Sequence, residues 1–224
     1  MPPRRRTRQQ AGRAGPEPFG PPLSTRSTAI ITAVCVIVVL AAGVAIQLTT
    51  AARPTGAFAA CRAQPQLAPG FFAGAPRMCI NPTQDLNATI ATTGGDVTVL
   101  LQTSRAPQTV NNFVVLALNG YYDGRSFENS SGWYIAAGDT RDFGYSLSRA
   151  PIPRNEKWSP GSLGMARLPD GRISGSQFFI TRSSWQGGNP PVSYNQFGIV
   201  LKNFSAVTAL SDSNQILRIT VTKG

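Results

Sequence analysis

An uncharged apolar stretch near the N-terminus is the first clear pattern along the chain. Residues 29–46 carry no charge, and continuing to residue 52 gives about 24 residues, more than the roughly 20 that a helix needs to cross a bilayer. Six arginines precede the stretch, whereas only Arg53 and Arg62 fall in the twenty residues after it. By the positive-inside rule, this pattern predicts one transmembrane helix at 27–52, with a cytoplasmic N-terminus and the rest of the chain outside.

A cleaved leader is the alternative interpretation of this stretch. The apolar run is longer than the roughly 7–15 residues usual in a signal peptide. Ala57, Ala59 and Ala60, just before Cys61, resemble a lipoprotein cleavage site, but they lie more than ten residues past the apolar run. This spacing favours an uncleaved signal-anchor, and a lipid on Cys61 stays open as the alternative.

The segments on either side of the stretch have no apolar periodicity. Residues 1–26 combine the six arginines with six prolines and one acid, Glu17, which predicts a disordered basic cytoplasmic tail rather than a nucleic-acid site. Residues 53–84 are rich in Pro, Ala and Gly, which predicts an extracytoplasmic stalk. Cys61 and Cys79 would lie there in an oxidising compartment, which favours a disulfide over two free thiols.

Short apolar–polar alternations begin at about residue 85. Residues 86–92 and 96–101 alternate on either side of Gly94 and Gly95, which predicts a β-hairpin. The later runs with strand character are separated by Gly, Pro and Asn; they are 176–181, 197–201 and 215–221.

Two helices are expected among these strands. Apolar residues with helical spacing at 110, 113, 114, 117 and 118 predict a helix that ends at Gly120, and a short helix is expected around 204–210. Many short strands with two helices predict a mostly-β domain over 85–224, in which a closed barrel is capped by the helices.

Composition excludes several kinds of chemistry. The chain has 224 residues and a formal net charge of +11, and it contains no histidine. Without histidine there is no Ser-His-Asp or Cys-His nucleophile and no His-ligated zinc, and three cysteines are too few for a four-Cys metal site. Composition therefore excludes these nucleophiles and these zinc sites, and we expect no metal and no cofactor.

Several short strings stand in order along the C-terminal domain: TVNNF at 109–113, GYYDG at 120–124, GD at 138–139, GSLGMA at 161–166 and GSQFFIT at 175–181. Together they resemble the cyclophilin family of peptidyl-prolyl isomerases, from about residue 86 to 222. The resemblance implies a closed eight-stranded antiparallel β-barrel capped by two helices. It also implies catalysis of X–Pro bond rotation, which breaks no bond and so needs neither histidine nor metal.

The resemblance also assigns roles to individual residues. The family's catalytic arginine falls on Asn129, whose neutral amide cannot supply the charge or the donor fork of a guanidinium. Gln177 is the second residue expected at the catalytic site, Ala136 stands where the family has a glutamine, and Arg125 or Arg167 is the alternative donor. The expected substrate-binding residues are Trp133, Tyr134, Ala166, Arg167, Phe179 and Tyr194.

Two functions remain open on this basis. The family framework implies a membrane-tethered, extracytoplasmic prolyl isomerase that assists the folding of exported proteins, with activity reduced by the loss of the arginine at Asn129. The alternative is a catalytically silent cyclophilin-like module that binds Pro-containing segments or partner proteins. In both, the protein is a single-pass protein of the cell membrane, its partners are Pro-containing polypeptides, and no nucleic acid is involved. A barrel used only as a structural spacer is a third interpretation, which a filled groove would favour.

Overall fold

The structure of the protein is a computed structural model that describes residues 56–68, 70–139, 144–148, 158–184 and 194–224, apart from the side chains of 129–131. None of the helices within these ranges combines the length and apolar character that crossing a bilayer requires. The predicted basic tail and the predicted transmembrane helix at 27–52 lie outside the described residues, and both stay predictions.

The predicted hairpin is confirmed and forms the start of the sheet. Strands β1 (Leu86–Thr92) and β2 (Val97–Leu101) pair antiparallel, with Ile90 opposite Val97. Every second side chain of both strands is buried, as expected when apolar and polar residues alternate on a strand with one face toward the core.

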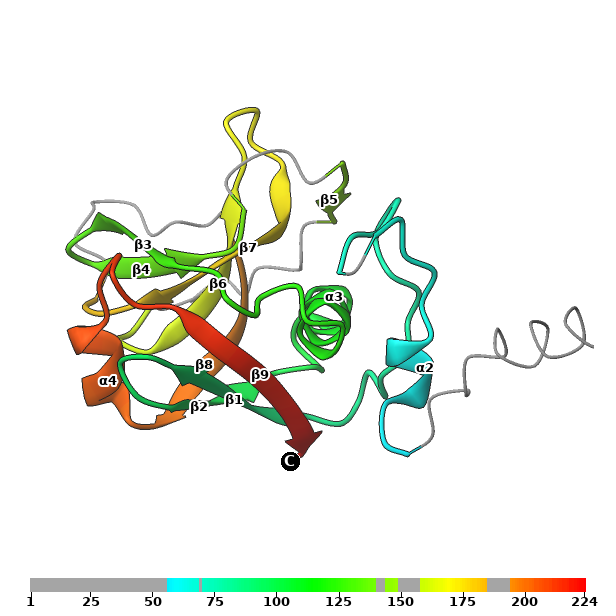
Figure 1. The fold of residues 1–224 in the computed structure, drawn as a ribbon, viewed down its shortest axis with the longest axis horizontal. Helices are drawn as coiled ribbons and strands as arrows, with labels where there is room; N and C mark the ends of the chain where they lie inside the picture. Colours follow the sequence, from blue (N-terminus) through cyan, green and yellow to red (C-terminus); the bar gives the residue numbers. More distant parts are fainter. Residues whose placement is uncertain (1–55, 69, 140–143, 149–157, 185–193) are drawn as a thin grey trace, which may run out of the picture. The chain divides into compact units, whose positions relative to one another are not determined.

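Seven further strands extend the sheet within the described residues, each antiparallel to its neighbours (Figure 1). They are β3 (Phe127–Ser131), β4 (Tyr134–Ala137), β5 (Ser146–Leu147), β6 (Ser162–Arg167), β7 (Ile173–Thr181), β8 (Asn195–Lys202) and β9 (Ile216–Lys223). The strand order is β3-β4-β7-β6-β8-β2-β1-β9, and β5 pairs with β7 outside this path. The mostly-β fold with eight strands in one antiparallel path agrees with the expectation, and β5 is a two-residue addition.

The expected closure of the barrel is wrong. β3 and β9 are the two ends of the strand order, and within the described residues one isolated bridge, Ser126 to Gln215, joins them in place of a ladder. At this bridge Phe127 N–H donates to the Asn214 carbonyl at 3.0 Å. Two more backbone hydrogen bonds join the chain before β3 to Ile216: Gly124 N–H donates to the Ile216 carbonyl at 2.8 Å, and the Ile216 N–H donates to the Arg125 carbonyl at 2.9 Å. Beyond Ile216, within the described residues, β9 forms a ladder with β1 alone, and the barrel stays open.

Both predicted helices are present. Helix α3 (Pro107–Leu118) begins with a proline, whose missing N–H is not needed in a first helical turn. Asn119 is its C-cap, and Gly120 follows with φ 73°, the left-handed conformation common just after a helix. Helix α4 (Phe204–Ala209) is shorter, and Figure 1 shows it on a different side of the strands from α3.

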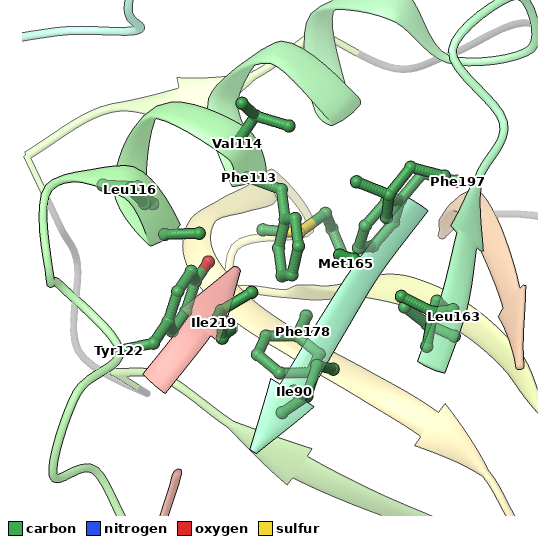
Figure 2. Close-up of a cluster of buried hydrophobic side chains, with 14 of the residues drawn as sticks. Ile90, Phe113, Val114, Leu116, Tyr122, Leu163, Met165, Phe178, Phe197 and Ile219 are labelled. Carbon is green, nitrogen blue, oxygen red and sulfur yellow. The ribbon is translucent and has the colours of Figure 1, made fainter. Parts of the chain in front are cut away.

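The main core lies between α3 and the sheet (Figure 2). The Phe113 ring of α3 is central to it, with centroids 5.4 Å from Tyr122, 5.4 Å from Phe178 and 5.3 Å from Phe197. All four side chains are fully buried, and the Tyr122 hydroxyl donates to the Ser176 carbonyl at 3.0 Å. These contacts fix α3 against β7 and β8 and so set the position of β7, which carries part of the candidate site.

The segment before β1, predicted as a stalk, packs against α3 (Figure 1). It contains the short helix α2 (Ala59–Arg62) and a disulfide between Cys61 and Cys79. Asn111 of α3 is buried; it accepts the Cys79 backbone N–H at 2.8 Å and donates to the carbonyls of Pro76 and Arg77. The disulfide pairing that the sequence favoured is present, and the segment belongs to the same compact unit as the barrel.

Loss of this disulfide is predicted to destabilise the domain. Cys61 and Cys79 are 18 residues apart. Closing a loop of that size removes entropy from the unfolded chain, a stabilisation of about 3 kcal/mol. We expect the full chain with Cys61→Ser and Cys79→Ser to lose about that much free energy of unfolding, measured by tryptophan fluorescence in urea. The parent with reductant serves as the matched sample, and equal midpoints for parent and variant would contradict this prediction.

Candidate functional site

A groove lies on the face of the sheet opposite the main core, over β3, β4, β7 and β6. Its volume is about 180 Å³. Pockets for drug-sized ligands span roughly 300–1,000 Å³, so this one suits a single side chain of a peptide. All but one of the lining residues come from these four strands and the turn between β3 and β4, and Tyr194 lies just before the start of β8. The lining residues are Glu128, Trp133, Tyr134, Ala136, Ala166, Arg167, Gln177, Phe179 and Tyr194.

Strand β7 supplies the floor of the groove through the alternation of its side chains. Phe178 is fully buried in the main core, whereas Phe179, 3% exposed, belongs to a second cluster with Ala136 and Trp158. Successive side chains of a strand point to opposite faces, so the two adjacent phenylalanines serve the core and the groove in turn.

Four aromatic rings surround Phe179. Their centroids lie 5.2 Å (Trp158), 5.2 Å (Tyr194), 5.5 Å (Tyr134) and 5.9 Å (Trp133) from the Phe179 centroid. Trp158 is stacked on Phe179 with 27° between the planes, and the other three rings meet it edge-on. Such pairs contribute about 0.5–1.5 kcal/mol each beyond their buried area, so the layer holds Phe179 in place.

Gly164 of β6 leaves the space that these rings occupy. A Cβ at this position would lie 2.5 Å from Phe179 Cζ and 2.5 Å from Trp158 Cη2, closer than carbon atoms approach without a shift. Gly164 is directly opposite Phe179 in the β6–β7 pairing, so the ring lies over the backbone of the neighbouring strand. The second glycine of the GSLGMA string is therefore required by packing.

A hydrogen bond between Gln177 and Glu128 forms the polar side of the groove. Gln177 Nε2 donates to Glu128 Oε2 at 3.3 Å, and the Gln177 backbone N–H donates to Ser174 Oγ at 3.0 Å. Within the described residues the side-chain amide of Gln177 has no other partner, so its second N–H and its oxygen are free for a ligand.

The two arginines that could replace a catalytic cation have different positions. The Arg125 guanidinium lies 3.9 Å from the ring centroid of Tyr121, and its Nε donates to the Tyr121 carbonyl at 2.6 Å, so it does not line the groove. Arg167 does line the groove; it is exposed, and its Nε donates to the Gly171 carbonyl at 3.2 Å. Of the two, only Arg167 is placed to contact a ligand in the groove.

Tyr194 is a groove residue whose pKa is shifted. Partial burial raises the pKa of its phenol above the ordinary value, the nearby Tyr134 raises it further, and the positive charge of Arg167 lowers it. The hydroxyl of Tyr194 therefore stays protonated through the neutral range, and it offers a hydrogen bond rather than a charge to a ligand.

Asn129 lies in an irregular part of β3. Glu128 pairs with Ala136 and Ser131 with Tyr134, and the register shifts between these pairs. Asn129 and its successor therefore face a single residue of β4, which is the arrangement of a β-bulge, a feature that re-aims side chains beside active sites. The side chain of Asn129 lies outside the described part of the chain, so its predicted role stays a prediction.

The structure brings most of the predicted site residues together. Apart from Asn129 they share the groove; they are Trp133, Tyr134, Ala166, Arg167, Gln177, Phe179 and Tyr194. Two contributors were not predicted, Glu128 and Trp158. Glu128 follows the buried Phe127, so strand alternation indicates the groove face for it. Trp158 had no comparable signal, because no apolar period leads up to it in the sequence.

A larger cavity of about 570 Å³ lies between the end of α3 and β9. It contains none of the predicted site residues, and the Arg62 guanidinium beside it donates to the Leu118 carbonyl at 3.0 Å. Over the described ranges, no three acidic or cysteine side chains gather where they could hold a metal ion. The groove over β7 is therefore the candidate site.

The sequence matches the family described as "Cyclophilin type peptidyl-prolyl cis-trans isomerase/CLD" over residues 87–222, more than half of the chain. The fold and the groove described above agree with this match. The chain belongs to the cyclophilin family.

Individual relatives match over shorter stretches. A peptidyl-prolyl cis-trans isomerase of Helicobacter pylori is 35% identical over 100 residues, which cover 42% of this chain and 60% of the relative. The isomerase CYP18-1 of Arabidopsis thaliana is 29% identical over 134 residues, which cover 54% of this chain and 80% of the relative. The match thus spans only 60% of the length of the Helicobacter pylori relative.

A solved structure supports the same fold. A cyclophilin-type peptidyl-prolyl cis-trans isomerase of Cryptosporidium parvum, crystallised in the presence of the dipeptide Ala-Pro, is 27% identical to this chain, with a TM-score of 0.51. The similar part covers 62% of this chain and 99% of that structure, so the cyclophilin-like domain accounts for almost the whole of the relative.

The packing of Gly164 gives a prediction for the site. In Gly164→Ala the added methyl group must displace Phe179 or Trp158, an overpacking that costs about 1–3 kcal/mol. We expect this variant to unfold at a lower urea concentration than the parent, with altered tryptophan fluorescence in the native state. Gly74→Ala is the matched control, because a Cβ there has no neighbour within 4 Å. Equal stability of the two variants would contradict the proposed packing.

Proposed function

We propose that the protein is a peptidyl-prolyl cis–trans isomerase with reduced activity, tethered to the membrane by residues 27–52, that acts outside the cytoplasm on exported proteins. The observation that carries the proposal is the groove in which Ala166, Gln177, Phe179 and Tyr194 meet. Membership of the cyclophilin family supports the reaction, and the solved relative with Ala-Pro supports a proline-containing ligand.

The chemistry needed for this reaction is modest, and the groove can supply its main parts. Rotation about an X–Pro bond has a barrier of roughly 18–20 kcal/mol, and no covalent bond is made or broken. An apolar floor at Phe179 can hold the proline ring, while the amide of Gln177 bonds the peptide beside it. Acceleration requires that these contacts be better with the twisted amide than with either planar form.

Reduced activity follows from the residue at position 129. A neutral amide there offers the twisted peptide bond no positive charge. Removing one main donor from such a site costs about 10²–10³ in rate. Arg167 is the remaining cation of the groove, and its Nε is already bonded to the Gly171 carbonyl.

The proposed location rests on two features of the chain. The apolar stretch at 29–46 follows an arginine-rich segment, the pattern of a signal-anchor with a cytoplasmic N-terminus. The disulfide between Cys61 and Cys79 supports an oxidising compartment for the domain, because disulfides are rare in the reducing cytosol. Exported proteins that cross this compartment are the proposed clients.

A catalytically silent binding module is the second candidate function. Phe179 is only 3% exposed beneath its aromatic neighbours, and position 129 lacks the arginine. A groove with these properties can hold a proline ring without lowering the barrier to rotation.

The test follows cis-to-trans relaxation of an X–Pro peptide with the full chain in mild detergent. We expect the parent to accelerate relaxation, Gln177→Ala and Phe179→Ala to remove most of the effect, and Asn129→Arg to raise it by at least about tenfold. Leu217→Ala, an exposed apolar position on β9 outside the groove, is the control and should match the parent.

One result would decide against the isomerase, and another would decide against this groove as its site. Peptide binding by the parent without acceleration, with activity gained only in Asn129→Arg, would establish the binding module. Acceleration that survives both Gln177→Ala and Phe179→Ala would move the site away from this groove.

The pH dependence offers a separate prediction. The chain has no histidine, and the raised pKa of Tyr194 keeps its phenol neutral well above pH 7. We expect the acceleration to be constant between about pH 6 and pH 9, the range in which an ordinary histidine or a perturbed thiol titrates. A sigmoidal change with its midpoint inside that range would contradict the role of Tyr194 as a neutral hydroxyl.

A further inference from the structure

The groove is electrically asymmetric. Its two charged lining residues are Glu128, on β3, and Arg167, on β6. In the sheet order β3-β4-β7-β6, two strands separate them, so the acid and the base lie on opposite walls, with Phe179 of β7 between. A peptide seated on Phe179 therefore has a negative wall on one side and a positive wall on the other.

The carboxylate of Glu128 is positioned to contact a ligand in the groove. It is partly buried, and it pairs across to Ala136, a small residue that leaves its carboxylate open to the groove. Its one described partner is the neutral amide of Gln177, at 3.3 Å, and within the described ranges it forms no ion pair. A partly buried carboxylate without a cation attracts positive charge more strongly than a fully hydrated one, because solvent screens it less.

We propose that Glu128 selects substrates that carry a lysine or arginine directly before or directly after the proline. The basic side chain lies along the β3 wall, where its cation meets the Glu128 carboxylate. Arg167 on the β6 wall repels the same group, so the peptide binds in one direction. This inference rests on the proposed function, since it names the class of substrate that the same groove takes.

The experiment compares peptides that differ only beside the proline. Four peptides carry lysine, arginine, norleucine or glutamate at the neighbouring position, before the proline in one series and after it in another. Two-dimensional NMR exchange with the full chain in mild detergent measures the catalysed interconversion, and line broadening in the same samples measures binding. Norleucine keeps the length of the lysine chain without its charge.

We expect the basic peptides in one of the two series to exceed the glutamate peptide by about three- to tenfold in binding and in catalysed rate, with norleucine between them. In Glu128→Gln, which keeps the size of the side chain and an acceptor for Gln177, the preference should fall to within about twofold. In Glu128→Lys it should reverse. Raising the salt from about 0.05 M to about 0.5 M should weaken the preference in the parent.

The control variant is Asp212→Asn, which removes one exposed acid in the turn before β9 and leaves the groove unchanged. It should keep the full preference of the parent. A preference that falls equally in Asp212→Asn and Glu128→Gln would show general attraction by net charge and would overturn the proposal. An equal loss for all four peptides in Glu128→Gln would also overturn it, since Glu128 would then only position Gln177.

The two proposals fail in different ways. Basic selectivity in binding without any acceleration would refute the isomerase and leave the role of Glu128 intact. Acceleration of all peptides to the same extent would refute the role of Glu128 and leave the isomerase intact.

Discussion

The two-sided character of β7 is the constraint on which the rest of the structure depends. Phe178 locks the strand to Phe113 of α3 in the main core, and Phe179 forms the floor of the groove on the other face. Both rings lie on one rigid strand that pairs with β4 and β6, so the position of the groove floor is fixed by the packing of the core. A change that shifts β7 therefore alters the core and the groove at once.

The groove combines this fixed apolar floor with a small number of polar groups. Gln177 and Glu128 are bonded to each other at one side, and Arg167 lies at the other. Tyr194 completes the layer around Phe179 and contributes a neutral hydroxyl. Such a site can bind a proline-containing segment and orient it, and its charges give the bound peptide a preferred direction.

Much of the fold could be predicted from local patterns. The hairpin of β1 and β2, helix α3 and the alternation of Phe178 and Phe179 all depend on periodicity over a few residues, which the sequence displays directly. The open edge between β3 and β9 depends on where two strands that are distant in the sequence diverge. A pattern over a few residues cannot predict that position. The packing of the segment before β1 onto Asn111 is equally a matter of distant contacts.

The residues of the candidate site also differ in whether the sequence could predict them. Side chains in short family strings, such as Gln177 and Phe179, could be assigned from the resemblance, whereas Trp158 follows a stretch without periodicity and became part of the site only through its stacking on Phe179. Glu128 was visible in the sequence as the residue after Phe127. Its significance depends on the hydrogen bond from Gln177, which only the three-dimensional arrangement supplies.

The proposed function requires that Phe179 and its neighbours form the binding site for proline. Intermolecular NOE contacts between an Ala-Pro-containing peptide and the full chain in mild detergent test it most directly. We expect contacts from the proline ring to the Phe179 ring and the Ala166 methyl group, and none to Leu118 beside the larger cavity. Proline contacts confined to Leu118 and its neighbours, or binding unchanged in Phe179→Ala, would contradict it.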